Sequence, residues 1–283
     1  MKTLAIYNPK SGSYSKEKLD YSIKVLSEKT GEKITLVESK YPGFGMDFFK
    51  KESPELVFIF GGDGFVNEIV KALFLNKIET FIYPIPFGTV NVFCREHKIG
   101  KNYYESLQKF GFKRAKNLFV GAFDENIFIQ MLGIGFDARA VKKVDMKIKR
   151  YTGRYSYFWA GIQSLLSEYN SFWVSLDGLD FNPYHLIVSI GENYGGEFKI
   201  AKQKDGYFSV IMAEKGDFFS LLKYLIHIFT FYKNKKNYYT KTVKVSGVNE
   251  VQIDGEFYST KSNKFFIEIV DSKLKLILPE ETD

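Results

Sequence analysis

The sequence predicts a two-domain protein, with an N-terminal α/β domain built on a parallel sheet and a mainly antiparallel β-sandwich domain after it. Three observations lead to this fold class. The chain has 283 residues, a length that favours two domains. Up to residue 117, short apolar runs alternate with helical patterns, as in an open parallel sheet. Beyond that point, short strand patterns separated by turn signals dominate. We therefore expect domains at 1–117 and 118–283.

The first domain is expected to alternate strands with helices. The run at 56–60, Leu-Val-Phe-Ile-Phe, is apolar throughout, which is typical of a strand buried on both faces of a parallel sheet. Leu19, Ile23 and Leu26 have helical spacing, and Gly31 is suited to end their helix. The expected strands are 3–7, 33–37, 56–60 and 81–84, and the expected helices are 16–29, 44–51 and 66–75.

The second domain is expected to contain few helices. Turn signals such as Asp177-Gly178, Asp205-Gly206 and Asp254-Gly255 separate its strand patterns. The expected strands are 118–122, 127–132, 172–176, 185–189, 207–213, 242–246, 250–253, 264–270 and 273–278, and the expected helices are 155–168 and 218–231.

The composition narrows the class of protein but does not identify its ligand. A net charge of +7 attracts nucleic acid, anionic lipid and nucleotides alike, so its sign does not choose among them. Aromatic residues make up 17% of the chain, and we expect part of this excess to meet an apolar partner. Cys94 is the single cysteine, which excludes a disulfide framework and favours the cytoplasm. No uncharged apolar stretch of about 18 residues occurs, so no membrane span is expected.

A glycine-rich loop, Gly61-Gly62-Asp63-Gly64, lies where the buried strand at 56–60 meets the helix at 66–75. In an open α/β sheet, ligands bind at the carboxyl ends of the strands. Glycines there let backbone N–H groups approach phosphates, whose charge a helix N-terminus favours. Asp63 is a candidate to reach a bound Mg²⁺ or the nucleophile. The alternative is a tight turn in which Asp63 only caps the helix, and this loop alone does not decide between the two.

Two further loops follow predicted strands. Asn8-Pro9-Lys10-Ser11-Gly12 comes after the strand at 3–7, and Pro86-Phe87-Gly88-Thr89-Val90-Asn91 comes after the strand at 81–84. If these strands are neighbours of the one at 56–60, all three loops gather at one edge of the sheet and form a phosphate or nucleotide crevice. Lys10 then supplies a cation, and Ser11 and Thr89 supply hydroxyl groups. The signature G-x-x-x-x-G-K-[ST] is absent, so the chain is not an ordinary P-loop enzyme.

Five motifs in order resemble those of the diacylglycerol kinase catalytic domain superfamily, which includes bacterial diacylglycerol kinases, YegS-like lipid kinases, and sphingosine and ceramide kinases. The resemblance spans nearly the whole chain. The motifs are Asn8 to Gly12, Gly61 to Gly64 with Asn67-Glu68, Pro86 to Asn91, Gly133-Ile134-Gly135-Phe136-Asp137-Ala138, and Asp254-Gly255-Glu256.

This resemblance implies an ATP- and Mg²⁺-dependent lipid kinase that transfers the γ-phosphate to a diacylglycerol-like or related lipid. It implies a nucleotide-binding first domain and a lipid-binding second domain. Asp63 and Glu256 would be the catalytic residues, with Glu256 as the base that takes the proton from the lipid hydroxyl. A structural Mg²⁺ would lie by the Asp205-Gly206 turn, on Asp205 and the backbone oxygens of Lys202 and Tyr207. The residues expected to line the nucleotide are Asn8, Pro9, Lys10, Ser11, Gly12, Ser39, Gly61, Gly62, Asp63, Gly64, Phe65, Val66, Asn67 and Thr89.

Two departures from the family pattern keep a second hypothesis open. Many relatives carry Thr where this chain has Phe65, and Asp where it has Val92. The alternative is therefore a catalytically weak homologue that binds nucleotide or lipid as a sensor. Glu256 without its companion motifs would be an ordinary acidic residue after a hairpin turn.

A basic run bears on the partners of the chain. Lys142, Lys143, Lys147, Lys149 and Arg150 precede an aromatic stretch at 151–159, which itself contains Arg154. This segment, and the one at 221–236 that ends in lysines, is a solvated connection, a surface that touches anionic lipid or, on charge alone, a surface that binds nucleic acid. We expect a lipid substrate, peripheral contact with an anionic membrane from the cytoplasm, and a homodimer. A nucleic-acid partner is not expected, because no motif of that class occurs.

Overall fold

The computed structural model describes residues 1–143, 169–194, 198–230 and 237–280. It divides into two compact units, one made of Met1–Leu118 with Asp271–Asp283 and one made of Phe119–Val270. The predicted helix at 155–168 and most of the basic run at 142–154 lie outside the described residues. No helix among the described residues is long and apolar enough to cross a membrane.

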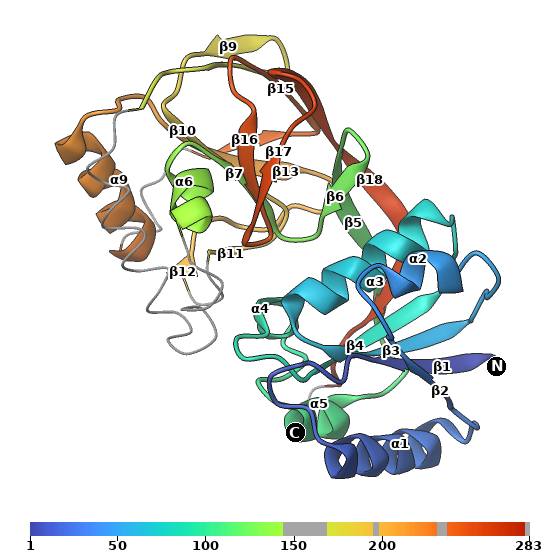
Figure 1. Cartoon of the computed structure of the whole chain (residues 1–283). Helices are drawn as coiled ribbons and strands as arrows, with labels where there is room; N and C mark the ends of the chain where they lie inside the picture. The colour runs from blue at the N-terminus through green and yellow to red at the C-terminus, as the bar shows by residue number, and fades with distance from the viewer. Residues whose placement is uncertain (144–168, 195–197, 231–236, 281–283) are drawn as a thin grey trace. The chain divides into compact units, whose positions relative to one another are not determined.

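The first unit is an open parallel sheet with helices on both faces (Figure 1). The strand order is β2-β1-β3-β4, followed by the end of β18, and every pairing is parallel. The apolar run of β3 is buried along its whole length, as its sequence predicts. The elements are β1 Thr3–Tyr7, α1 Lys16–Thr30, β2 Thr35–Glu38, α2 Phe44–Phe48, β3 Leu56–Gly61, α3 Asp63–Leu75, β4 Phe81–Pro86, α4 Val92–Glu96 and α5 Tyr103–Lys109.

The second unit is a sandwich of antiparallel strands. One layer has the order β14-β13-β10-β7-β16-β17, and the other contains β18-β15-β8-β9. The elements are β5 Ala115–Phe123, β6 Asn126–Phe128, β7 Met131–Ile134, α6 Phe136–Lys143, β8 Trp173–Leu176, β9 Leu179–Phe181, β10 His185–Ser189, β11 Asn193–Tyr194, β12 Phe198–Lys199, β13 Phe208–Ala213, α9 Phe218–Thr230, β14 Tyr238–Thr240, β15 Thr242–Ser246, β16 Glu250–Ile253, β17 Glu256–Ser259 and β18 Lys264–Ile277.

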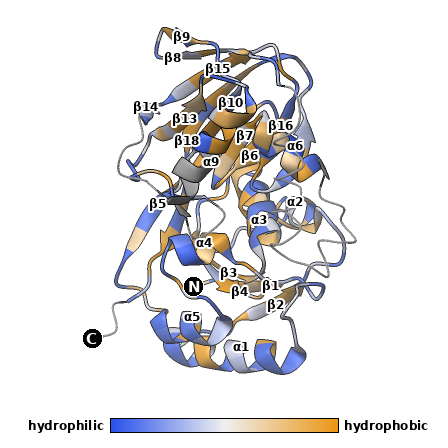
Figure 2. Ribbon diagram, turned by 90° about the vertical axis from the view of Figure 1, so that its left-hand side faces the viewer, coloured by the Kyte–Doolittle hydropathy of each residue, from blue (hydrophilic) through white to orange (hydrophobic). Residues whose placement is uncertain are grey.

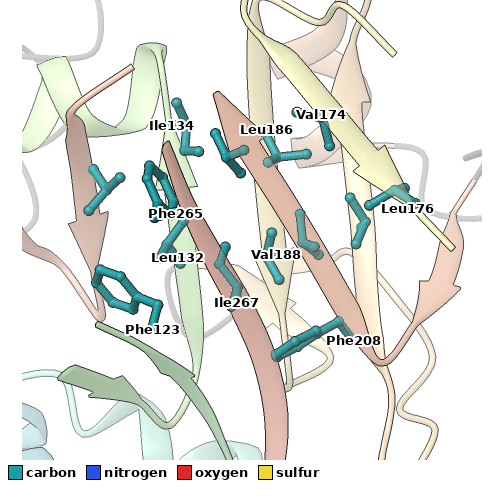
Figure 3. Close-up of a cluster of buried hydrophobic side chains, with 14 of the residues drawn as sticks. Phe123, Leu132, Ile134, Val174, Leu176, Leu186, Val188, Phe208, Phe265 and Ile267 are labelled. Atoms are coloured by element: carbon teal, nitrogen blue, oxygen red, sulfur yellow. The ribbon is translucent and has the colours of Figure 1, made fainter. Parts of the chain in front are cut away.

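Apolar side chains from both layers fill the space between them. Leu132, Val188 and Phe208 from one layer pack with Val174 and Ile267 from the other (Figure 3). Figure 2 shows how hydropathy is distributed between interior and surface elements. The central strands are coloured as hydrophobic, and the outer helix α1 is coloured as mainly hydrophilic. The predicted fold class, a parallel α/β domain followed by a mainly antiparallel sandwich, is confirmed.

The last strand corrects the predicted range of the second domain. The sequence places residues 118–283 in one domain, whereas Asp271–Asp283 belong to the first unit. The cause is that β18 continues past Val270 instead of ending there. Its Lys275 and Leu276 pair in parallel with Phe81 and Ile82 of β4.

Candidate active site

The three glycine-containing loops of the first unit lie side by side at the carboxyl end of the parallel sheet. They meet because β1, β3 and β4 are neighbours (Figure 1). The backbone N–H of Asn8 donates to the carbonyl of Phe60 at 3.2 Å, and that of Ser13 to the carbonyl of Phe87 at 2.9 Å. The N–H of Phe87 donates to the carbonyl of Gly61 at 2.9 Å. The strands that precede the three loops are therefore neighbours, as the expected clustering of the loops at one edge of the sheet requires.

Glycine residues bring the loops into close contact. A Cβ atom on Gly88 would lie 2.5 Å from the Cα atom of Gly62 and 2.7 Å from Oδ1 of Asn91. Both distances are shorter than van der Waals contact, so a larger residue at position 88 would separate two of the loops. The remaining loop approaches less tightly, since a Cβ atom on Gly12 would lie 3.1 Å from Oγ1 of Thr89.

Asp63 joins the starts of two helices. It is the first residue of α3, and its Oδ1 accepts a hydrogen bond from the backbone N–H of Phe93 in α4 at 2.9 Å. The residue before α4, Asn91, has φ of 55° and bonds Gly88 through both its Oδ1 and its Nδ2, each at 2.9 Å. Asp63 thus caps the helix that follows the third loop, while its second carboxylate oxygen makes no hydrogen bond within the described part of the chain.

The loop at residues 61–67 presents fewer groups to a ligand than the sequence suggests. The side chains of Phe65 and Val66 are buried, and both backbone N–H groups donate to the carbonyl of Gly62 at 3.0 Å. The N–H groups of Asp63 and Gly64 belong to the first turn of α3, so they lack a partner within the helix. Of the nucleotide contacts expected in this loop, the geometry therefore favours the N–H groups of Asp63 and Gly64.

The cation and hydroxyl groups of this edge are accessible. Lys10 and Thr89 are exposed, and Nζ of Lys10 makes no hydrogen bond or ion pair with the residues that the structure describes. Oδ1 of Asn8 accepts from the N–H of Lys10 at 2.9 Å and so shapes the loop that holds Pro9 and Ser11. Ser39 follows β2, where its N–H donates to the carbonyl of Tyr7 at 2.9 Å.

Glu256 lies in the second unit, directly after the turn that joins β16 to β17. Asp254 and Gly255 form this turn with φ of 47° and 87°, and Ile253 pairs with Glu256 across it. The Glu256 side chain is exposed and has no bonded partner among the described residues. The hairpin that the Asp-Gly pair predicts is present, and Glu256 starts a strand as expected.

A buried carboxylate occurs in the motif at 133–138, and the sequence analysis assigned it no role. Asp137 on α6 is buried, and Tyr194 donates a hydrogen bond to its Oδ1 at 2.7 Å. Burial raises its pKa from 3.8 to about 6, and the Tyr194 bond opposes this rise. A Cβ atom on Gly133 would lie 2.6 Å from Oδ2 of Asp137 and 2.9 Å from Nε2 of Gln252. Neither Tyr194 nor Gln252 carries a local sequence signal that could have placed it here.

The Asp205 turn offers oxygen atoms of the kind that Mg²⁺ binds. The Asp205 carboxylate is exposed and has no hydrogen bond or ion pair in the described segments. The Lys202 carbonyl accepts from the Tyr239 hydroxyl at 3.3 Å, which leaves its second lone pair available. No group of three potential metal-binding side chains occurs among the described residues. One carboxylate with two carbonyls fits Mg²⁺, which usually keeps several water ligands.

Lys142 is the one member of the basic run whose side chain is described. It forms an ion pair with Glu250 and lies over the ring of Phe257, with Nζ 5.0 Å from the ring centroid. Both contacts are within the second unit. They give Lys142 a structural role in holding α6 against the β16–β17 hairpin.

The first unit is an open α/β domain that presents N–H groups, a lysine and hydroxyl groups at the ends of its strands, as proteins that bind phosphate groups do. The family model for the diacylglycerol kinase catalytic domain matches residues 2–122 of this chain. A diacylglycerol kinase of Staphylococcus carnosus strain TM300 is 26% identical over 271 residues, which cover 89% of this chain and 87% of that protein. A diacylglycerol kinase of Staphylococcus aureus strain RF122 / ET3-1 is 26% identical over 273 residues, which cover 89% and 85%.

A solved structure shares the fold along nearly the whole chain. It is the crystal structure of a diacylglycerol kinase from Bacillus anthracis strain Sterne, with a TM-score of 0.80 and 23% identity over 98% of this chain and 96% of that chain. The resemblance to the diacylglycerol kinase catalytic domain superfamily is thus confirmed, and the comparisons support the predicted class of enzyme, a lipid kinase.

Proposed function

We propose that this chain is an ATP- and Mg²⁺-dependent kinase that transfers the γ-phosphate to the hydroxyl of a diacylglycerol-like or related lipid. The observation that carries the proposal is the packing of the three loops, at the strand ends of a domain matched by the diacylglycerol kinase family. A lipid is proposed as the acceptor because the similar proteins of Staphylococcus carnosus and Staphylococcus aureus are diacylglycerol kinases.

The first unit would hold the nucleotide. The N–H groups of Asp63 and Gly64 at the start of α3 would donate to phosphate oxygens, where the helix dipole favours negative charge. Lys10, whose ammonium group is free within the described residues, would add a positive charge. Thr89 and Ser11 would donate hydroxyl hydrogen bonds. Ser39 would contact the nucleotide from the end of the neighbouring strand β2.

Glu256 would act as the general base. Its carboxylate takes the proton of the lipid hydroxyl as the oxygen forms a bond to the γ-phosphorus, and the bond from that phosphorus to the bridging oxygen of ADP breaks. When bound, Mg²⁺ neutralises charge on the phosphate oxygens. The free oxygen of Asp63 is available to hold a phosphate-bound ion. Asp205, with the carbonyls of Lys202 and Tyr207, would hold a structural one.

Lipid contact is proposed for the start of α9. Phe219 is 79% exposed and Phe218 is 41% exposed, an unusual pair for the surface of a folded unit. Lys223, one turn later, is also exposed and suits an anionic membrane surface. The lysines at 233, 235 and 236 lie outside the described residues.

The decisive experiment measures transfer of labelled phosphate from ATP to a panel of lipids, with and without Mg²⁺. Glu256→Gln should lower kcat by about 100- to 10,000-fold, the usual contribution of a general base. Glu268→Gln is the matched control, because Glu268 is also an exposed, unpartnered carboxylate on a described strand of the second unit. Glu268→Gln should match the parent.

The same assay separates this proposal from the sensor alternative, which buried Phe65 favours because the relatives' hydroxyl group is absent from that position. A parent that transfers phosphate to no lipid, or a Glu256→Gln variant as active as the parent, would reject the kinase mechanism. Binding of ATP without transfer would then support a sensor.

A further inference from the structure

We infer that Asp254 and Gln252 are positioning residues that hold the Glu256 carboxylate in its catalytic orientation. This inference rests on the proposed role of Glu256 as the base. It concerns side chains that do not touch the lipid or the nucleotide themselves. Their effect on the reaction would be exerted through the β16–β17 turn.

The orientation of the Glu256 side chain is set mainly by its backbone. Among the described strands, β17 is the edge of its layer and pairs with β16 alone. Glu256 is the first residue of that strand, and no described residue binds its carboxylate. The direction of the side chain therefore follows the turn before it. That turn has two consecutive residues at positive φ, 47° for Asp254 and 87° for Gly255.

Asp254 fixes the turn with more bonds than a hairpin needs. Its carboxylate accepts three backbone hydrogen bonds, from the N–H groups of Ile129 at 2.8 Å, Gln130 at 2.9 Å and Met131 at 2.8 Å. Its own N–H donates to the carbonyl of Met131 at 3.0 Å. The tip of the hairpin is thus attached to the segment between β6 and β7.

Another Asp-Gly hairpin in the same unit shows that this anchoring is specific. Asp177 and Gly178 join β8 to β9 with φ of 49° and 87°, nearly the same backbone as the turn before Glu256. Within the described residues, the Asp177 carboxylate accepts a single hydrogen bond, from the hydroxyl of Thr240 at 2.9 Å. Turn geometry alone therefore does not require three N–H donors on the aspartate.

Gln252 supports the turn from its other side. It is 3% exposed, and its Oε1 accepts from the N–H of Gly255 at 2.8 Å. Its Nε2 lies over Gly133, next to the carboxylate of Asp137. The side chains of Asp254 and Gln252 thus restrain Asp254 and Gly255, the two turn residues that precede Glu256.

Asp254→Asn should loosen the anchor without removing the turn, because Asn also tolerates positive φ. Oδ1 of Asp254 accepts two of the three bonds and Oδ2 accepts the bond from Ile129. In the variant an amide donor faces one of these N–H groups. Displacement of a catalytic group by about 1 Å can cost about 100-fold in rate. We expect kcat to fall about 10- to 100-fold with KM for ATP unchanged.

The test is a double-mutant cycle on lipid phosphorylation with Asp254→Asn and Glu256→Gln. If Asp254 acts through Glu256, its substitution should change kcat less than two-fold in the Glu256→Gln background. Asp177→Asn is the matched control and should keep the parental kcat. Gln252→Met is a second variant that removes the bond to Gly255, and it should also lower kcat while leaving KM for ATP unchanged.

The outcomes separate this inference from the proposed function. An unchanged kcat in both Asp254→Asn and Gln252→Met, or equal losses in the parental and Glu256→Gln backgrounds, would overturn the inference and leave the kinase proposal standing. If Asp254→Asn does not fold, the cycle is measured with Gln252→Met under the same criterion. A parent without any phosphate transfer would reject both, because no base would remain to be positioned.

Discussion

Replacing Gly88 with alanine should separate the two loops that meet at Gly62. The added Cβ atom would lie 2.5 Å from the Gly62 Cα atom, so one backbone has to move by about 1 Å to reach normal contact of about 3.5 Å. Such overpacking costs about 1–3 kcal/mol. The same atom would lie 2.7 Å from Oδ1 of Asn91, which threatens the two hydrogen bonds between Asn91 and Gly88. Each of these contributes about 1 kcal/mol.

The expected loss of unfolding free energy is therefore about 2–5 kcal/mol, or a melting temperature lower by about 5–15 °C. Differential scanning calorimetry measures it, and titration with ATP in the same buffer should show weaker binding. Gly12→Ala is the comparison, because its Cβ atom would meet the rotatable Oγ1 of Thr89 at 3.1 Å. It should cost less than Gly88→Ala. Equal melting temperatures for Gly88→Ala and the parent would refute the packing argument.

Two further substitutions test the core next to the candidate site. Phe65→Thr should lower the unfolding free energy by about 2–4 kcal/mol, because the ring is 6% exposed and packs against Gly61. Denaturant titration measures this loss, and a value under about 1 kcal/mol would contradict the expectation. Asp137→Asn should change the pH dependence of stability. The folded pKa of Asp137, about 6, exceeds its ordinary value of 3.8, so the parent loses stability as pH rises from about 4 through 6, by up to about 3 kcal/mol relative to the asparagine variant. Parallel stability curves from pH 4 to 7 would rule this out.

The arrangement of the first unit was largely predictable because its signals are local. The apolar run of β3 followed by glycines marks a buried strand that ends in a turn, and both are present. The gathering of the loops followed from their positions after strands. Helix α5 could also have been found, since Asn102 caps it and Glu105 stands three residues later, as in a helix start signal.

Other features depend on residues far apart in the sequence. Helix α4 begins after Asn91, and the carboxylate that caps it comes from Asp63. The sequence analysis predicts two strands, at 264–270 and 273–278, where the structure has the single strand β18. In the structure the Ser272 hydroxyl donates to the carbonyl of Leu118, and the strand continues past Lys273, whose φ is 61°, to pair with β4. No local pattern could reveal these pairings.

The position of Asp63 changes what the two departures from the family pattern mean. Phe65 is packed into the core against Gly61, so its effect on the loop is the loss of a hydroxyl group rather than obstruction by the ring. Val92 lies in the first turn of α4, where many relatives carry a carboxylate, and Asp63 caps this turn. Among the three loops, Asp63 is the one acidic residue in the sequence. One carboxylate would therefore have to hold α4 with Oδ1 and a phosphate-bound cation with Oδ2. The strength of nucleotide binding should thus depend on whether α4 is well ordered, as well as on the Gly61–Gly64 loop.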